Sequence, residues 1–460
     1  MKVLNIDKAN FLKGMSLTVS SGDGGFSPES LGIEIDRGVN LGLLTAGRSL
    51  TDYSTGLGGE VVTNVKFKVS GSGGSIKNYL FCTNGKIYES DPLIPPGYSL
   101  KDTATLITFS SNSHAIVFRD ILYVSGTTDI FSDDFSFTSP NDNWWTGTQG
   151  KTALTAGVPH KLFEFGNILY CLNGNKIASW DGTTAVDDAF TLPLGYIITD
   201  VAVDNDLVYL TIVKHVNDYS VYTETKIIVW NGISPNQWLR EVPIFSTAIS
   251  AIKKVDNGFI FFSARNIFYF DGYNYQWIRK ISNTPTFNQV TAFNGNIYYA
   301  DNGVSCYNTR FKIFSNPVYL SYTITINVID ISYLDYIDLF YSVSSVPKWS
   351  RALTNNATTV TFYSDWYDLS PSYIRKYGLI FSTALATNSE YTVRFYDETD
   401  NVIFTDTISK TLDGAKSAIY KKIDKHLNLF KITITFNNSA NSPIKAIKVF
   451  YEQSEHFTGK

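Results

Sequence analysis

A short hairpin pattern that recurs along the chain is the feature that most constrains its fold. In its clearest copy, FGNILYCLNGNKIASWDG at 165–182, apolar runs at 168–170 and 177–180 lie on either side of Asn173-Gly174. An Asn-Gly pair favours positive φ angles and joins two antiparallel strands by a tight turn. This segment therefore predicts a β-hairpin.

The same pattern occurs about six times. The further copies are at 79–88, 121–131, 207–232, 259–272 and 297–307. The last aromatic residues of successive hairpins are spaced roughly 37 to 50 residues apart, the range of propeller blades. A unit of this size cannot bury its own apolar face, so the copies must stack, and radial stacking protects their edges. We predict an all-β chain with a divergent β-propeller of six to seven blades over 60–316, without WD or kelch signature residues.

The pattern changes from residue 317 onwards. Roughly eight strands follow at short spacing with polar turns between them, which is typical of a β-sandwich. The alternation of apolar and polar residues at 431–436 indicates a strand with one buried face and one solvent-exposed face. We predict a jelly-roll-like β-sandwich over 317–455 and a polar tail at 456–460.

Residues 1–59 form an N-terminal arm that does not follow the hairpin pattern. Its apolar pieces at 15–19, 31–35 and 41–44 are separated by glycine-rich connections. Strands this short do not form a core by themselves, so they must dock elsewhere. They could complete a propeller blade, including a seventh, or add a strand to a neighbouring subunit. We expect partial docking on the propeller, with the first stretch on a neighbour.

Composition excludes several classes of protein. Charged residues make up 17% of the chain and the net charge is −4, which argues against a nucleic-acid groove built from a basic stripe. Composition does not exclude a neutral channel through which DNA passes. No window approaches the roughly 20 apolar residues of a membrane span. The N-terminus lacks a signal-peptide pattern, which predicts synthesis in the cytosol.

No sequence motif indicates catalysis, a metal site or a cofactor. Cys82, Cys171 and Cys306 lie far apart without a CxxC motif, which favours small buried side chains over zinc ligands or a disulfide. The five histidines are scattered, and no GxSxG elbow is present. The adjacent carboxylates at 133–134 and 187–188 point to opposite faces in strands or cap turns in loops. We predict that the protein is not an enzyme and binds neither metal nor cofactor.

Aromatic residues in two insertions are the candidate interaction residues. One insertion, at 135–150, carries Trp144 and Trp145, and the other, at 215–225, carries Tyr219 and Tyr222. Loops on a rigid scaffold tend to carry binding residues. Together with Trp238, these side chains could stack on a sugar. The alternative is that the tryptophans fold back onto a blade edge.

The C-terminal region contains the distinctive strings SDWYDL at 364–369 and YIRKYGLIFS at 373–382, followed by YTVRFYDETDNVIFTDTI at 391–408. With the divergent propeller before them, these strings resemble the tail nozzle or packaged-DNA stabilisation proteins of short-tailed bacteriophages. The resemblance covers residues 60–455 at the level of architecture.

The resemblance implies a non-catalytic structural component of the virion tail, assembled from proteins made in the host cytoplasm. It further implies a ring of copies around the DNA channel, in contact with other tail and connector proteins and without sequence-specific DNA contacts. Two other hypotheses stay open. One is a lectin-like tail protein that binds a carbohydrate or a receptor. The other is a propeller glycosidase, which would need two or three carboxylates about 5 to 10 Å apart at one mouth of the tunnel.

Overall fold

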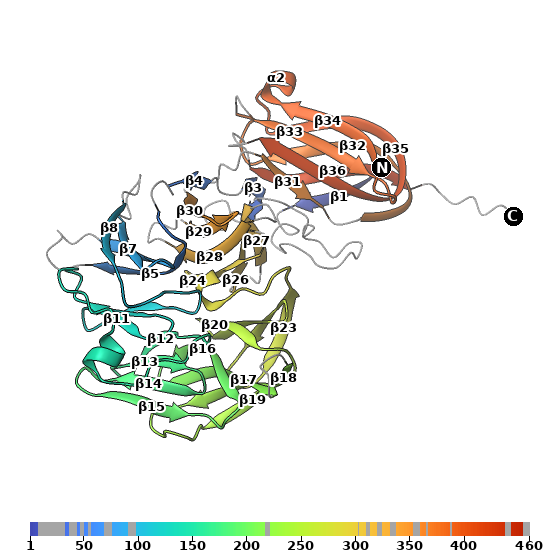
Figure 1. Ribbon diagram of the computed structural model, residues 1–460. Helices are drawn as coiled ribbons and strands as arrows, with labels where there is room; N and C mark the ends of the chain where they lie inside the picture. Colours follow the sequence, from blue (N-terminus) through green and yellow to red (C-terminus); the bar gives the residue numbers. More distant parts are fainter. Residues whose placement is uncertain are drawn as a thin grey trace. The chain divides into compact units, whose positions relative to one another are not determined.

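The protein is an all-β chain that divides into two compact units (Figure 1). Unit 1 comprises Met1–Thr51, Asn302–Ser321 and Ala352–Lys460, and unit 2 comprises Asp52–Asp301 and Tyr322–Arg351. The computed structural model describes residues 1–7, 33–35, 44–46, 50–53, 57–68, 76–90, 98–216, 221–301, 303–309, 313–319, 324–331, 337–352, 359–364, 367–386, 389–437 and 443–453.

Unit 2 contributes strands to seven antiparallel sheets, counted over the described residues. Five of the sheets lie wholly within it. Their strands are β5 (Val61–Lys68), β6 (Ile76–Cys82), β7 (Lys86–Ser90) and β8 (Tyr98–Thr103); β9 (Ala115–Phe118), β10 (Ile121–Ser125) and β11 (Ile130–Asp133); β12 (Leu162–Phe165), β13 (Ile168–Asn173), β14 (Lys176–Trp180) and β15 (Ala185–Thr191); β16 (Tyr196–Asp204), β17 (Leu207–Val216), β18 (Val221–Trp230) and β19 (Arg240–Ile244); and β20 (Ile249–Val255), β21 (Gly258–Ser263), β22 (Asn266–Phe270) and β23 (Tyr275–Lys280).

Two further strand groups complete the set. β24 (Val290–Phe293) pairs with β25 (Asn296–Ala300). The last sheet has the order β28-β29-β30-β4, with β28 (Ile324–Ile331), β29 (Ile337–Val343), β30 (Val346–Ala352) and β4 (Leu50–Asp52). Two short helical turns, η1 (Trp144–Thr148) and η2 (Phe287–Gln289), lie between strands.

The first strands of these sheets form a closed ring. β5 contacts β9, β9 contacts β12, and β12 is followed by β16, which contacts β13 of the preceding sheet. The contacts continue from β16 to β20, β24 and β28, and β28 returns to β5. This cyclic order makes unit 2 a β-propeller of seven blades, which confirms the predicted propeller.

Residues upstream of the first blade complete the last one. β4 is the outer strand of the sheet that begins with β28, and the Tyr53 amide donates a hydrogen bond of 2.8 Å to the Trp349 carbonyl. The expected docking of the arm on the propeller is therefore confirmed for β4. The boundary expected at residue 317 differs from this division, because Tyr322–Arg351 belongs to unit 2. The alternation of apolar and polar residues in this segment does not distinguish a blade strand from a sandwich strand, so the sequence places the segment in the sandwich.

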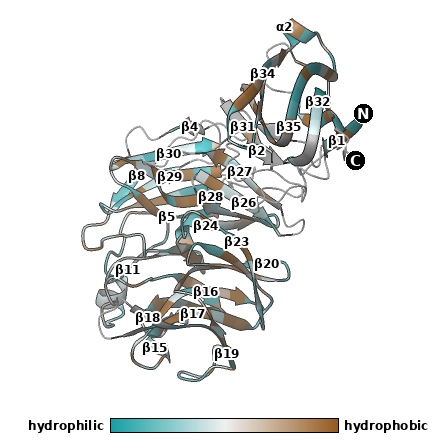
Figure 2. Cartoon of the chain, turned by 90° about the vertical axis from the view of Figure 1, so that its right-hand side faces the viewer, coloured by the Kyte–Doolittle hydropathy of each residue, from teal (hydrophilic) through white to brown (hydrophobic). Residues whose placement is uncertain are grey.

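The predicted turn chemistry agrees with the hairpin geometry. Asn173 pairs with Lys176, and Gly174 has φ of 65°. The strands mix hydrophobic and hydrophilic residues (Figure 2). Hydrophobic side chains from neighbouring blades pack together in one core cluster. Trp230, for example, lies with its ring centroid 5.6 Å from that of Tyr170 and 5.0 Å from that of Phe190.

In the described parts of unit 1, nine strands form one network. The order is β2-β3-β36-β32-β35-β33-β34, with β1 on β36 and β31 on β35. These are β1 (Lys2–Asp7), β2 (Ile33–Ile35), β3 (Leu44–Ala46), β31 (Thr359–Tyr363), β32 (Tyr367–Phe381), β33 (Glu390–Tyr396), β34 (Val402–Ser409), β35 (Ala418–Asn437) and β36 (Ile444–Gln453). In addition, β26 (Gly303–Asn308) pairs with β27 (Ile313–Tyr319), and α2 (Lys410–Asp413) follows β34.

The 20-residue strand β35 is shared by two groups of strands in unit 1. Its first part pairs with β32 and its second part pairs with β31 and β33. Tyr377 of β32 lies with its ring centroid 5.4 Å from that of Phe395 of β33, so the two groups share an aromatic core. The jelly-roll-like sandwich itself stays a prediction.

The start of the chain belongs to unit 1. Lys2–Asp7 pairs with β36 in antiparallel register, and the Ile6 side chain is fully buried. These residues therefore dock within their own chain, and the expectation that the first stretch engages a neighbouring subunit stays a prediction. The apolar piece at 15–19 lies outside the described residues.

Candidate functional site

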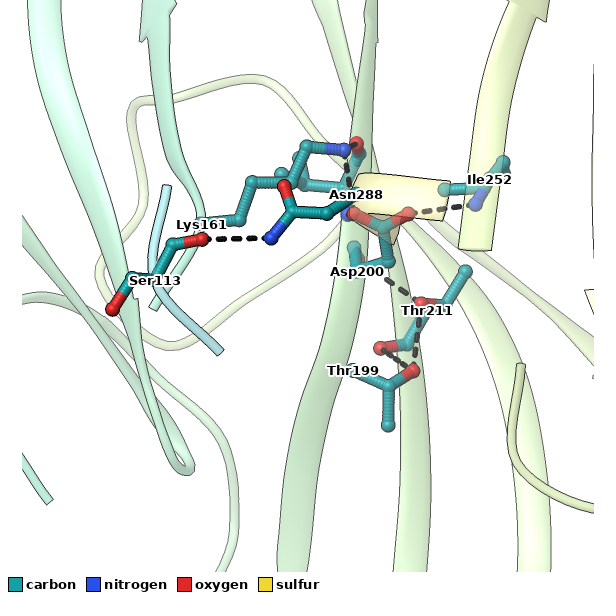
Figure 3. A network of polar contacts seen from close by, with 8 residues as sticks. Ser113, Lys161, Thr199, Asp200, Thr211, Ile252 and Asn288 are labelled. Atoms are coloured by element: carbon teal, nitrogen blue, oxygen red, sulfur yellow. Dashed lines mark hydrogen bonds and ion pairs between the residues drawn. The ribbon is translucent and has the colours of Figure 1, made fainter. Parts of the chain in front are cut away.

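Polar side chains from or next to the first strands of several blades form a group that we call the central cluster, and Figure 3 shows Ser113, Lys161, Asp200 and Asn288 from it. They come from the segments before β9 and β12, from β16 and β20, and from η2. Its members are Ser113, His114, Lys161, Asp200, Lys253 and Asn288.

A buried ion pair links three blades in this cluster. Lys161 Nζ lies 2.5 Å from Asp200 Oδ1 and donates a second hydrogen bond of 2.7 Å to the Val201 carbonyl. Asp200 is fully buried, and its Oδ1 and Oδ2 also accept from the amides of Val201 and Ile252, each at 2.7 Å. The carboxylate therefore joins the beginning of β12 to β16 and β20.

A bulge in β16 positions this carboxylate. The register between β16 and β17 shifts between Ile198 and Asp200, so Thr199 is the extra residue. Thr211 Oγ1 lies 2.8 Å from Thr199 Oγ1 and donates to the Asp200 carbonyl at 3.0 Å. Bulges commonly redirect side chains in this way. The hydroxyls satisfy the polar backbone that the bulge leaves unpaired.

The short helix η2, which precedes β24, hydrogen-bonds three other blades. Asn288 Nδ2 donates to the carbonyls of Val62 in β5 (3.0 Å) and Ser113 before β9 (2.9 Å). Gln289 Nε2 donates to the Ile326 carbonyl in β28 at 2.5 Å. The two side chains of η2 therefore connect the sixth blade to the first, second and seventh.

Burial and mutual repulsion set the charge of the basic members. Burial lowers the pKa of Lys253 from 10.5 to about 7, with Lys161 lowering it further and Asp200 opposing the shift. Burial also lowers the pKa of His114, and both lysines act in the same direction. The cluster thus has three basic groups and one carboxylate.

A neutral pocket of about 660 Å³ opens beside the central cluster. Its lining includes the polar side chains of Thr155, Asn175, Tyr196 and Thr199. The loop at one side is fixed, because the His160 ring bonds the carbonyls of Thr155 (2.9 Å) and Gly126 (2.8 Å). Its volume is in the range of small-ligand sites. Sequence reasoning missed both pocket and cluster.

The predicted stacking tryptophans are not available to a ligand. Trp144 and Trp145 are 6% and 2% exposed, so their predicted role in stacking is wrong. The Trp145 amide donates to Asp129 Oδ1 at 3.0 Å, and the Trp144 ring lies 5.2 Å from the Trp180 ring. These contacts fold η1 back onto a blade, as in the alternative reading.

The other three candidates do not join a common site in the described residues. Trp238 is partly buried, 6.5 Å from the Phe190 ring. Tyr222 lies in β18, and the side chain of Tyr222 and all of Tyr219 are outside the described part of the chain.

The carboxylates at 133–134 cap a turn, whereas those at 187–188 lie in β15. Asp133 Oδ1 accepts from the Phe137 amide at 3.1 Å, and Asp134 Oδ1 from the Ser136 amide at 2.9 Å. The bonds to Ser136 hold the pKa of Asp134 below its usual value, whereas burial raises that of Asp133. Asp187 accepts from the Thr152 amide at 3.2 Å.

The cysteines are free and buried. Burial raises the pKa of the Cys82 thiol to about 12, so this side chain is a protonated apolar group at neutral pH. Within the described ranges, no group of three or more His, Cys, Asp or Glu side chains is arranged to hold a metal ion. No helix among these residues is long and apolar enough to cross a membrane.

Comparison with known proteins finds likeness in structure alone. No protein-family model and no curated protein matches the chain. Among solved structures, the chain is similar to the WD40 β-propeller domain of Doa1, at 13% identity and a TM-score of 0.45 over 66% of this chain and 97% of that one. The chain is also similar to the Neurospora crassa Pan2 WD40 domain, at 8% identity and a TM-score of 0.42 over 67% of this chain and 95% of that one. Its similarity to the Phanerochaete chrysosporium exo-β-1,3-galactanase is 12% identity and a TM-score of 0.30 over 88% of this chain and 99% of that one. At such identities the likeness concerns the fold and says nothing of function.

Proposed function

We propose that the protein is a non-catalytic structural component of a tailed-bacteriophage virion, a nozzle or connector subunit of the tail. Its partners are copies of itself and other virion proteins, arranged as a ring around the DNA channel. The virion assignment is supported by the resemblance of the strings at 364–369, 373–382 and 391–408, together with the propeller that precedes them.

The observation that carries the structural role is the use of the central polar groups. Asp200 makes contacts to three neighbouring segments, and η2 bonds the first, second and seventh sheets. Hydrogen bonds of this kind are strong in a buried, low-dielectric site and rigidify it. The groups that an enzyme would direct at a substrate here hold the ring together.

In the proposed assembly the DNA channel lies between subunits. The hydrogen bonds by which η2 joins the first, second and seventh sheets support this arrangement, because they hold the centre of each propeller together. Contacts to DNA there would be sequence-independent, consistent with the low charge of the chain.

Exposed apolar side chains supply contacts for such an assembly. Leu194 and Phe245 are 90% and 92% exposed, and each lies in a connection from the last strand of one blade to the first strand of the next. Such connections emerge at one end of a propeller, because four antiparallel strands return the chain to the end at which it began. Large apolar anchors of this kind dominate protein interfaces, and a ring requires heterologous contacts that close.

Mass spectrometry of purified particles from a culture that makes this protein tests the virion role. We expect its peptides at a fixed stoichiometry to the capsid protein, and absence from the particles would refute the proposal. Native mass spectrometry of the recombinant chain tests the contacts. The pair Leu194→Ser and Phe245→Ser should weaken self-association, whereas Leu239→Ser, 61% exposed at the other end of the blades, should not.

A carbohydrate-binding protein is the second candidate, and the neutral pocket favours it. Tyr196 offers a ring, and Thr155, Asn175 and Thr199 offer hydrogen-bonding groups within about 660 Å³. A glycan array should then show binding that Tyr196→Ala abolishes and Trp277→Ala, a half-exposed residue of β23 outside the pocket, retains. Absence of binding by the unmodified protein across a broad array would eliminate this candidate.

A further inference from the structure

The central cluster contains more basic groups than carboxylates. Its basic members are His114, Lys161 and Lys253, and Asp200 is its carboxylate. Both oxygens of Asp200 are already occupied, by Lys161 Nζ and by two backbone amides. Within the described part of the chain, no ion pair or side-chain hydrogen bond involves Lys253. An ammonium group in a largely enclosed site without a counter-charge is costly.

His114 has an unfilled hydrogen-bonding position in the same place. Its Nδ1 is buried and has no partner in the structure. Its ring lies 6.1 Å from the ring of Phe287, and Lys161 Nζ lies 6.0 Å from the centroid of that same ring. Phe287 belongs to η2, so His114 and Lys161 both border the space beneath this helix. Buried polar atoms without a partner are rare and call for an explanation.

We propose that the central cluster binds a small inorganic anion, such as chloride or bromide, between Lys253 and His114. The anion accepts hydrogen bonds from Lys253 Nζ and from the His114 ring, and it balances the charge that Asp200 leaves uncompensated. Neither residue is completely buried, although the His114 Nδ1 atom itself is. Bound to the folded state alone, the anion stabilises the ring by mass action.

Two measurements test the anion site. The first follows thermal unfolding at pH 6.5 while sodium bromide replaces sodium gluconate at constant ionic strength. We expect Tm to rise by about 2 to 4 °C, and to stay constant in Lys253→Met. Lys254→Met is the matched control, because Lys254 is the next residue and is paired with Asp204 at 2.5 Å. It should keep the response of the unmodified protein.

The second measurement does not depend on a variant. Anomalous diffraction from crystals of the unmodified protein grown in bromide should place a peak within hydrogen-bond distance of Lys253 Nζ. The proposal is overturned if that position shows no peak, if bromide and gluconate give equal Tm values, or if Lys253→Met responds to bromide as the unmodified protein does.

Discussion

At the scale of single residues, the Lys161–Asp200 pair is the most demanding feature of the propeller. Both groups are removed from water, which costs hydration energy. Their attraction offsets this cost only because the distance between Nζ and Oδ1 is short and the other lone pairs of the carboxylate accept hydrogen bonds from backbone amides. Removing one partner therefore leaves a buried charge without compensation, whereas removing both does not.

We expect Asp200→Leu to reduce the free energy of unfolding by about 3 to 5 kcal/mol, the usual cost of breaking a buried pair from one side. The double variant with Lys161→Met should lose less than Asp200→Leu alone. Denaturant unfolding of the two single variants and the double variant gives the coupling free energy. A strictly additive double variant would contradict the ion-pair account.

Lys253 makes stability depend on pH. Its pKa is about 7 in the folded protein and 10.5 in the unfolded chain, so the unfolded state binds more protons between these values. The free energy of unfolding should therefore rise as pH increases from about 7 towards 10.5 in gluconate buffer. The groups facing Lys253 are Lys161, His114 and Asp200. Lys253→Met should flatten this part of the curve, and an unchanged slope in that variant would assign it to other groups.

Glycine is required at one predicted turn. Gly85 has φ of 79°, and a Cβ there would lie 2.4 Å from the Ala104 carbonyl oxygen. Gly157 has φ of 81° but nothing within 4 Å of its Cβ position. Gly157→Ala should cost roughly 1 to 2 kcal/mol from the left-handed backbone alone. Gly85→Ala should cost more by chemical denaturation, and equal costs would show that the clash relaxes freely.

At the scale of elements, β1 is an integral strand of unit 1. Its partner is β36, and Ile6 is fully buried, whereas Val3 is 43% exposed. A buried apolar side chain contributes transfer energy and fills space, so its loss costs more than that of an exposed one.

Ile6→Ala should therefore destabilise unit 1 by about 2 to 4 kcal/mol, and Val3→Ala by less than about 1 kcal/mol. Hydrogen exchange of the β36 amides at 446–451 provides the local readout. Faster exchange in Ile6→Ala but not in Val3→Ala is the expected result. Unchanged protection in both would mean that β1 is not needed for this sheet.

The hairpins could be predicted from sequence because their information is local. Asn173-Gly174 determines a turn between adjacent apolar runs, whatever surrounds it. The unit to which β28–β30 belong could not be predicted, because that depends on contacts distant in the sequence. Alternation of apolar and polar residues predicts a strand with one buried face, and it carries no information about which sheet covers that face.

The central cluster could not be predicted, because its members are far apart in sequence. Lys161 and Asp200 meet only when the third and fourth blades lie side by side, and Asn288 reaches Val62 and Ser113 only when the ring closes. A weak signal was present, since Asp200 interrupts the mainly apolar strand β16. Trp144 and Trp145 were misassigned because Asp129, which holds them, precedes the insertion that defines them in sequence.

At the scale of the whole molecule, the propeller is closed twice by segments distant in the chain. β4 completes the last blade from the N-terminal side, and η2 joins the sheets across the centre. Closure of both kinds restrains separation of the blades.

The most direct test of the proposed virion role is a cryo-electron microscopy reconstruction of tails from purified particles of a culture that makes this protein. The account predicts seven-bladed discs arranged with cyclic symmetry around the tail axis, with density for η2 across each disc and the DNA channel between subunits. Tails whose density contains no such propeller, in particles whose other proteins are all accounted for, would contradict it.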